Sequence, residues 1–373
     1  MLDRISQRMI GYRIKAARES SSWSQQQLAE ELGFKDRQTI SDLEKGKRVL
    51  KPEELMQICT SFDRDIDYFI DPFVIAGEGQ FSWRADPALS QNLLEDYELK
   101  AGQVIGLLRW LREIKGNQTS ALKRTLRISA TSSYEDAQQG AESLVQELNL
   151  GTITAERLLN SVQNKLDIPV LYVDTIQGND GEWISGAACT LKDMAVILIN
   201  RNEPTGRQNW DLAHELFHIL TWDAMVPAHR ESSAFEQASS KRRIEQLADN
   251  FASALLMPKP SLEKMIDFEK VAVVEYLFDL SVLFQVTPIA FAWRLFNLKF
   301  IDDNLRNELS QRSQDRSLST VPNLYSNNFI RMLQEALVKG DLSARKAAKT
   351  LDTNLNGLAD LFSQYQLNVP FDL

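Results

Sequence analysis

The stretch His214-Glu215-Leu216-Phe217-His218 is the most informative feature of this sequence. Residues four apart lie on one face of an α-helix, so a helix here directs both histidines toward one point. The chain has only three histidines, and two of them flank a glutamate at this spacing. Two imidazoles on one face are suitable ligands for a metal ion, and Glu215 beside them is a candidate general base. The competing interpretation is an ordinary helix with two incidental histidines.

A second helix, expected over 243–257, supplies the other groups that such a site needs. Glu245 and Asp249 are four residues apart and therefore share one face of that helix. A catalytic zinc takes three protein ligands and keeps one open position, so Glu245, 27 residues after His218, is the expected third ligand. Asp249 is expected to accept the free ring N–H of a liganding histidine, in the simplest case His214. The alternative is an ordinary solvated acidic pair.

Three short runs rich in β-branched and apolar residues precede the histidine helix, at 168–173, 183–190 and 194–200. Residues typical of turns separate them. We expect a small antiparallel meander of three strands. A helix that starts near Arg207 would pack across this sheet, and an extended peptide could add to the sheet edge beside it.

With these elements in place, residues 165–260 resemble the ImmA/IrrE group of intracellular metallopeptidases. The matching residues are the strand that ends in Asn200, then Arg207, Trp210-Asp211-Leu212-Ala213-His214-Glu215-Leu216, Glu245, Ala248-Asp249, Phe251-Ala252 and Leu255-Leu256-Met257-Pro258. Carried over by position, the resemblance implies that His214, His218 and Glu245 hold the metal and that Glu215 is the base. It also implies a zincin-like fold.

The chain departs from the family pattern at two positions. Trp210 stands where the family usually has phenylalanine. Phe217 stands between the histidines, where many members have glycine. The second change leaves the ligands intact but alters how closely backbone or substrate can approach. For the second group that would stabilise a developing oxyanion, Tyr172 and His229 are candidates, and their spacing selects neither.

Residues 1–72 carry a second signature, a bundle of short helices. Ser24 at an N-cap and Gln27 three residues later predict a capping box, and Gly33 ends the helix that they start. The next helix is expected over 37–45. Two short helices joined by a glycine-containing turn make a helix-turn-helix unit.

This segment resembles the Xre/Cro-type repressor domains, through the run Ser24-Gln25-Gln26-Gln27-Leu28-Ala29-Glu30, then Gly33, then Thr39-Ile40-Ser41-Asp42-Leu43-Glu44-Lys45-Gly46. The resemblance implies that the helix at 37–45 enters the major groove of DNA. The outward residues expected to meet base edges are Arg37, Gln38, Thr39 and Ser41. Gln25 is expected to contact a phosphate.

The charge of the amino-terminal segment supports DNA binding. Residues 1–52 contain eleven Lys or Arg and seven Asp or Glu, a net charge of +4 in a chain of −9. The acidic total argues against nonspecific coating of nucleic acid. The alternative is a helical bundle used for protein–protein contact. Binding to paired half-sites would require a homodimer.

Length and composition indicate an ordinary globular protein of two or three domains, with 373 residues, 43% of them hydrophobic and 25% charged. Since no run of eighteen apolar residues occurs and the start of the chain is polar, we expect neither a membrane span nor a signal peptide. Cys59 and Cys189 are expected to be buried free thiols, which fits a reducing cytoplasm.

The sequence predicts an α+β chain that is mostly helical. The expected parts are a helix-turn-helix domain (1–72), a helical linker region (73–165), a zincin-like metallopeptidase domain with a three-stranded sheet (166–310) and a small helical carboxy-terminal module (320–373).

The resemblances imply a DNA-binding regulatory zinc metalloendopeptidase that cleaves a specific repressor or antitoxin, or this chain itself, to relieve repression in stress. The expected partners are a DNA operator and the protein substrate. The His2Glu set suits zinc, although manganese or iron could occupy it. The alternative is a transcriptional regulator or antitoxin whose metal domain senses a signal or oligomerises without proteolysis.

Overall fold

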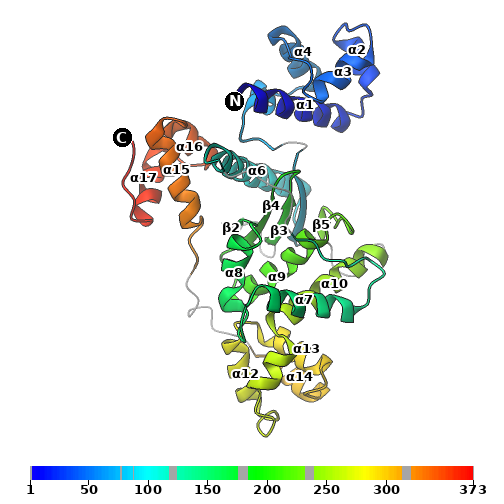
Figure 1. Ribbon diagram of the computed structural model, residues 1–373, viewed down its shortest axis with the longest axis vertical. Coiled ribbons are helices and arrows are strands. Elements are labelled where there is room, and N and C mark those ends of the chain that lie inside the picture. The colour runs from blue at the N-terminus through cyan, green and yellow to red at the C-terminus, as the bar shows by residue number, and fades with distance from the viewer. Residues whose placement is uncertain are drawn as a thin grey trace. The chain divides into compact units, whose positions relative to one another are not determined.

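The computed structural model describes residues 2–75, 78–86, 88–116, 124–174, 184–231, 239–312 and 321–372. The chain divides into two compact units. The first contains Met1–Gln80, Gln91–Thr119 and Asn327–Leu373, and the second contains Phe81–Ser90 and Ser120–Ser326. Helices dominate and one small sheet accompanies them (Figure 1), which confirms the predicted α+β class.

The amino-terminal bundle of the first unit has five helices. They are α1 (Leu2–Ser20), α2 (Gln25–Glu31), α3 (Arg37–Glu44), α4 (Pro52–Phe62) and α5 (Ile66–Ile70). Their apolar faces meet in one core, which includes Ile14, Leu28, Ile40, Ile58 and Phe69. The helix-turn-helix arrangement expected from the sequence is present in α2 and α3.

Local signals set the ends of these helices. The Ser24 hydroxyl accepts from the Gln27 backbone N–H at 3.2 Å, and the Ser24 N–H donates to the Gln27 side chain at 2.8 Å, which confirms the predicted capping box. Gly33 follows α2 with φ of 69°. Gly46 follows α3 with φ of 65°, and a Cβ there would lie 2.7 Å from the Cα of Arg8. Glycine alone fits this turn and lets α1 lie close to it.

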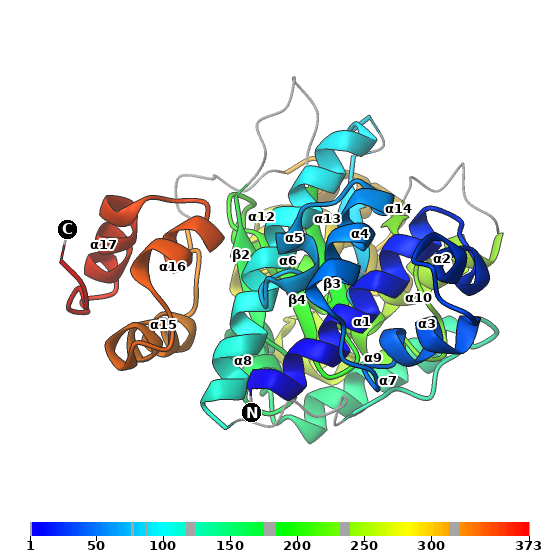
Figure 2. The ribbon, with the colours of Figure 1, turned by 90° about the horizontal axis from the view of Figure 1, so that it is seen from above.

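The first unit also contains α6 (Gln91–Ile114) and the carboxy-terminal helices α15 (Asn327–Lys339), α16 (Ala344–Thr350) and α17 (Leu355–Gln364). The last three, orange to red in Figure 2, form one cluster, and α15 and α16 contact α6. The predicted carboxy-terminal helices are confirmed.

The second unit is built on a five-stranded sheet with the order β2-β4-β3-β1-β5. The strands are β1 (Gln80–Ala85), β2 (Val170–Val173), β3 (Ile184–Thr190), β4 (Ala195–Asn200) and β5 (Arg230–Glu231). β2 pairs with β4 in parallel, whereas β3 pairs with β4 antiparallel.

The predicted antiparallel meander is therefore wrong, although its three strands exist. β4 lies between the other two, since its apolar run Ala195–Ile199 can be buried on both faces of the sheet, as is typical of a central strand. β2 then pairs in parallel on the free side of β4. Two strands differ from the prediction, β1 inside the expected helical linker region and β5. These short strands complete the sheet from distant parts of the chain.

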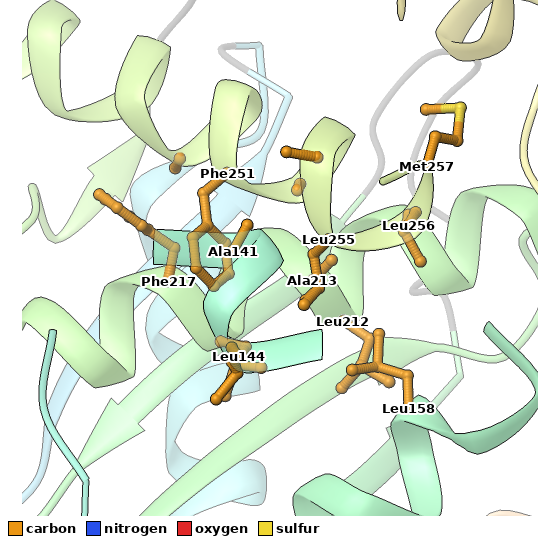
Figure 3. Close-up of a cluster of buried hydrophobic side chains, with 14 of the residues drawn as sticks. Ala141, Leu144, Leu158, Leu212, Ala213, Phe217, Phe251, Leu255, Leu256 and Met257 are labelled. Atoms are coloured by element: carbon orange, nitrogen blue, oxygen red, sulfur yellow. The ribbon is translucent and has the colours of Figure 1, made fainter. Parts of the chain in front are cut away.

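Four helices share the main core of the second unit with the sheet. They are α7 (Tyr134–Glu147), α8 (Ala155–Asn164), α9 (Thr205–Thr221) and α10 (Ser239–Leu256). α9 lies across β3 and β4, and α10 packs against both α9 and α7. Figure 3 shows side chains of this core, among them Leu144 and Leu212, and Phe217 and Phe251, whose rings lie close together.

Phe217, the unusual residue between the two histidines, has a packing role. Its side chain is fully buried, and its ring lies 5.4 Å from that of Phe251 on α10. The aromatic pair holds the histidine helix against the helix that carries Glu245. Phe217 therefore fixes the separation of the two elements that build the site.

The second unit ends with α11 (Lys259–Met265), α12 (Val274–Leu283), α13 (Pro288–Asn297) and α14 (Asp303–Ser310). Thr287 caps α13 by accepting from the N–H of Ala290, and Pro288 occupies the first turn as predicted. Within the described residues, no single helix has the length and hydropathy to cross a bilayer, whereas the strongly bent pair α12 and α13 meets that test jointly.

Candidate metal centre

α9 and α10 bring three predicted ligands together. The Nε2 atoms of His214 and His218 are 3.1 Å apart. The Oε2 atom of Glu245 lies 3.2 Å from the first and 3.4 Å from the second. Both histidines are buried and Glu245 is half-buried. The helix spacing of the histidines and the packing of α10 on α9 are sufficient to produce this cluster.

The separations fit the edges of a tetrahedral coordination shell. Ligand atoms about 2.0–2.1 Å from a zinc ion at tetrahedral angles lie about 3.3 Å from one another. The three separations of the cluster fall between 3.1 and 3.4 Å. Two imidazole nitrogens and one carboxylate oxygen are also a donor set that zinc accepts, and it leaves one position open for water or substrate. The residues present therefore fit a divalent metal.

Asp249 lies on the far side of the His214 ring. Its Oδ1 atom is 3.0 Å from Nδ1 of His214, as the one-turn spacing from Glu245 on α10 requires. When His214 donates its Nδ1 hydrogen to this carboxylate, Nε2 carries the lone pair that faces His218 and Glu245. The contact thus selects the tautomer that a metal needs.

Glu215 is completely buried between α9 and the sheet. Opposite it lies Gly186 on β3, where a Cβ would be 3.8 Å from Cγ of Glu215 and 2.7 Å from the backbone oxygen of Leu198. Glycine at 186 therefore lets β3 and β4 lie close together beside this carboxylate. The arrangement places a potential base next to the histidine cluster.

A further charged group lies one turn before the histidines. The Oδ1 atom of buried Asp211 is 3.3 Å from Nη1 of Arg84 on β1 and 3.3 Å from Nε of Arg207 on α9. Arg207 also donates from Nη2 to the hydroxyl of Ser185 on β3 at 3.4 Å. These contacts tie the start of α9 to two strands.

Sequence reasoning assigned no role to this group. The spacing of Arg207 and Asp211, four residues apart on the same helix as His214, could have indicated it. No local pattern could have indicated Arg84, which is 127 residues from Asp211 in the chain.

A cavity of about 330 Å³ opens beside Asp249, the residue whose carboxylate contacts His214. Its walls include Arg84, Arg207, Trp210, Asp249, Ile289 and Trp293. α9, α10, α13 and β1 each contribute to it. The carboxylate that contacts His214 is therefore also part of the cavity wall.

The two candidate oxyanion donors lie at opposite edges of the sheet. Tyr172 is on the edge strand β2, where burial raises the pKa of its phenol. His229 directly precedes β5 at the other edge, and its backbone oxygen accepts from the N–H of Trp83 at 2.9 Å. The structure thus separates the two candidates, which the sequence could not distinguish.

The expected base-contacting residues differ in exposure. Arg37 and Gln38 are exposed and Thr39 is half-buried, whereas Ser41 is buried. The expectation that Ser41 points outward is wrong. Because α3 packs against both α1 and α2, only part of its surface is accessible to solvent, and Ser41 lies outside that part. Gln38 donates to the Asp42 side chain at 3.0 Å.

Gln25, expected at a phosphate, is held within the bundle. Its side-chain nitrogen donates to Oε2 of Glu44 at 2.8 Å, and Arg18 donates to Oε1 of the same carboxylate at 2.6 Å. Buried Glu44 therefore joins α1, α2 and α3. A phosphate contact by Gln25 stays a prediction.

Comparison with known families identifies two segments. Residues 14–69 match the family model described as helix-turn-helix, and residues 165–296 match the model described as IrrE N-terminal-like domain. Searches of curated proteins and of solved structures found no significant match.

Proposed function

The chain joins an Xre-type helix-turn-helix domain to an ImmA/IrrE-type domain, and from this premise we propose that it is a DNA-binding regulatory metalloendopeptidase. The observation that carries the proposal is the convergence of His214, His218 and Glu245 beside buried Glu215. Metal binding alone does not require a glutamate at that position, whereas hydrolysis of a peptide does.

In this proposal a divalent metal held by His214, His218 and Glu245 would polarise the scissile carbonyl and lower the pKa of a water molecule. Glu215 accepts a proton from the attacking water and later returns it to the leaving amine. Asp249 keeps His214 in the tautomer that offers Nε2. Zinc suits the donor set best, and manganese or iron are the alternatives.

We propose that the substrate is a specific repressor or antitoxin, or the chain itself, and that its cleavage controls transcription under stress. Exposed Arg37 and Gln38 on α3 support contact with an operator. A DNA-binding domain on the same chain would raise the effective concentration of the peptidase near a DNA-bound target. Paired half-sites would take a homodimer. We also propose that the chain is divided as expected from its sequence, into parts at 1–72, 73–165, 166–310 and 320–373.

The test compares new protein N-termini in stressed cells that express the wild type, Glu215→Gln or Glu263→Gln. Glu263 is a half-exposed residue of α11 outside the site, so its change is a matched control. We expect a cleavage that the wild type and Glu263→Gln share and that Glu215→Gln lacks, while all three proteins bind equal metal.

The absence of a difference between the three proteins would contradict the proposal. If the three proteins give the same N-termini and each binds stoichiometric metal, the chain is not a peptidase under these conditions. The regulator whose metal domain senses or oligomerises then becomes the better proposal.

A further inference from the structure

The cavity beside Asp249 has a mixed wall, in which large apolar side chains that solvent reaches stand among polar ones. Trp293 and Ile289, both on α13, are 45% and 51% exposed, and half-buried Trp210 on α9 also lines it. A concave site with exposed tryptophan and isoleucine is typical of a place that binds an apolar group, because covering this surface removes it from water.

The charged groups of the cavity wall already face groups of opposite charge. Arg84 and Arg207 each lie 3.3 Å from buried Asp211. Buried Arg294 lies 3.3 Å from Glu142 and donates to the backbone oxygen of Met257 at 3.0 Å. These guanidiniums therefore have partners within the protein, which leaves the apolar side chains of the wall to contact a ligand.

The position of the cavity links it to a bound peptide. Asp249 forms part of its wall, and the carboxylate of this residue is 3.0 Å from Nδ1 of His214. Only the imidazole ring separates that contact from Nε2, which faces the other two ligands. The cavity wall at Asp249 is thus one imidazole ring away from the ligand atoms, a separation that a long side chain next to a carbonyl at the cluster can span.

We propose that this cavity is the specificity pocket of the peptidase and receives a large aliphatic or aromatic side chain adjacent to the scissile bond. The inference rests on the proposed function for its peptide substrate, but the pocket itself can be tested without turnover. Trp210, Ile289 and Trp293 contact the side chain, and Ser253 on α10 lies in the wall beside it.

The first test measures binding by ligand-observed NMR. The probes are N-acetyl-phenylalaninamide and N-acetyl-leucinamide, with N-acetyl-glycinamide and N-acetyl-aspartamide for comparison. We expect the two apolar probes to bind about tenfold more tightly than the others, as is typical of the discrimination by an apolar pocket. Equal binding of all probes, or preference for the aspartate derivative, would overturn the proposal.

Variants of residues in the cavity wall test whether the apolar probes bind there. Ser253→Trp would fill the cavity and abolish binding of the apolar probes, and Ile289→Ala would weaken it. Val282→Ala is the matched control for the second, since Val282 is 50% exposed on α12 and Ile289 is 51% exposed on α13. If Ser253→Trp does not fold, Ile289→Ala alone decides. Unchanged probe binding in a folded Ile289→Ala protein would contradict the proposal.

The second test uses a library of peptides made by digesting a whole proteome. Peptides cleaved by the wild type but not by Glu215→Gln should share a large apolar residue beside the cut, and Ile289→Ala should weaken that preference. Cleavage without the preference refutes the pocket and leaves the peptidase. Apolar probe binding that Ser253→Trp abolishes, in a protein whose cellular N-termini match those of Glu215→Gln, refutes the peptidase and leaves an apolar ligand site.

Discussion

Asp249 shows how much one residue outside the ligand set contributes to the site. Its carboxylate is half exposed and yet meets Nδ1 of buried His214 at 3.0 Å. A hydrogen bond to the ring nitrogen that does not face the metal fixes both the tautomer and the ring orientation of a ligand. The sequence spacing already indicated this contact, because Asp249 follows Glu245 by one helical turn.

Replacing Asp249 with alanine should weaken metal binding while leaving the three ligands in place. We expect the dissociation constant for zinc to rise by about tenfold to a hundredfold, as for other partners of ligating histidines. Competition with a chromophoric chelator measures this constant. Asp279→Ala, at an exposed position of α12, is the control and should have no effect. An unchanged constant in Asp249→Ala would show that His214 does not depend on this contact.

At the scale of one element, α4 of the amino-terminal bundle depends on an ion pair at its start. Glu54 at its third position accepts from both terminal nitrogens of Arg48, at 2.6 and 2.7 Å, and from the Lys51 N–H at 3.0 Å. The hydrogen bonds from Arg48 lower the pKa of Glu54 below its ordinary value, despite the opposing effect of burial. The connection between α3 and α4 is therefore held by a carboxylate that must be ionised.

The sign of the pH dependence follows from the lowered pKa of Glu54. The stabilisation is complete above the pKa of an unfolded glutamate, about 4.3, and is lost as the pH falls through the lower folded value. Glu54→Gln should therefore reduce the free energy of unfolding by about 2 kcal/mol at pH 7. Its difference from the wild type should shrink as the pH falls below about 4. Urea titrations followed by the methyl NMR signals of buried Ile40 and Ile58 measure it; a difference independent of pH would refute this role.

At the scale of the whole molecule, buried charges join segments that are distant in the sequence. Glu78 accepts from Arg109 on α6 at 2.8 Å and lies 3.6 Å from Arg13 on α1. Arg13 is completely buried, and burial lowers its pKa to about 10 while Glu78 opposes that shift. Within the first unit, this carboxylate lies between two guanidiniums and offsets part of the repulsion between them.

Removing Glu78 should therefore destabilise the first unit strongly. We expect Glu78→Ala to cost about 3–5 kcal/mol, because it leaves buried charges without compensation. Glu335→Ala is the control in the same unit, since its pair with Lys115 is half exposed and should contribute less than about 1 kcal/mol. Urea unfolding followed by the methyl signal of Ile14 compares the two. An equal loss in the free energy of unfolding for the two variants would show that Glu78 does not stabilise buried charge.

Much of the local structure could be predicted because its causes are local. The capping box of Ser24 and Gln27, the stop at Gly33 and the start of α13 at Pro288 all depend on residues within one turn. Burial was harder to predict, since it depends on what other elements cover. Ser41 belongs to a helix that was located correctly, yet the packing of α3 on α1 and α2 buries it. Cys59, expected to be buried, is half-buried for the same kind of reason.

Sequence spacing alone is enough to predict which groups share a helix face. His214 with His218, and Glu245 with Asp249, follow from the helical repeat, because residues four apart are neighbours in any α-helix. The position of β4 between β2 and β3, and the contact of Arg84 with Asp211 across 127 residues of chain, are known only from the folded structure. Strand order and such distant pairs arise from packing between segments. A pattern that extends over a few residues cannot predict that packing.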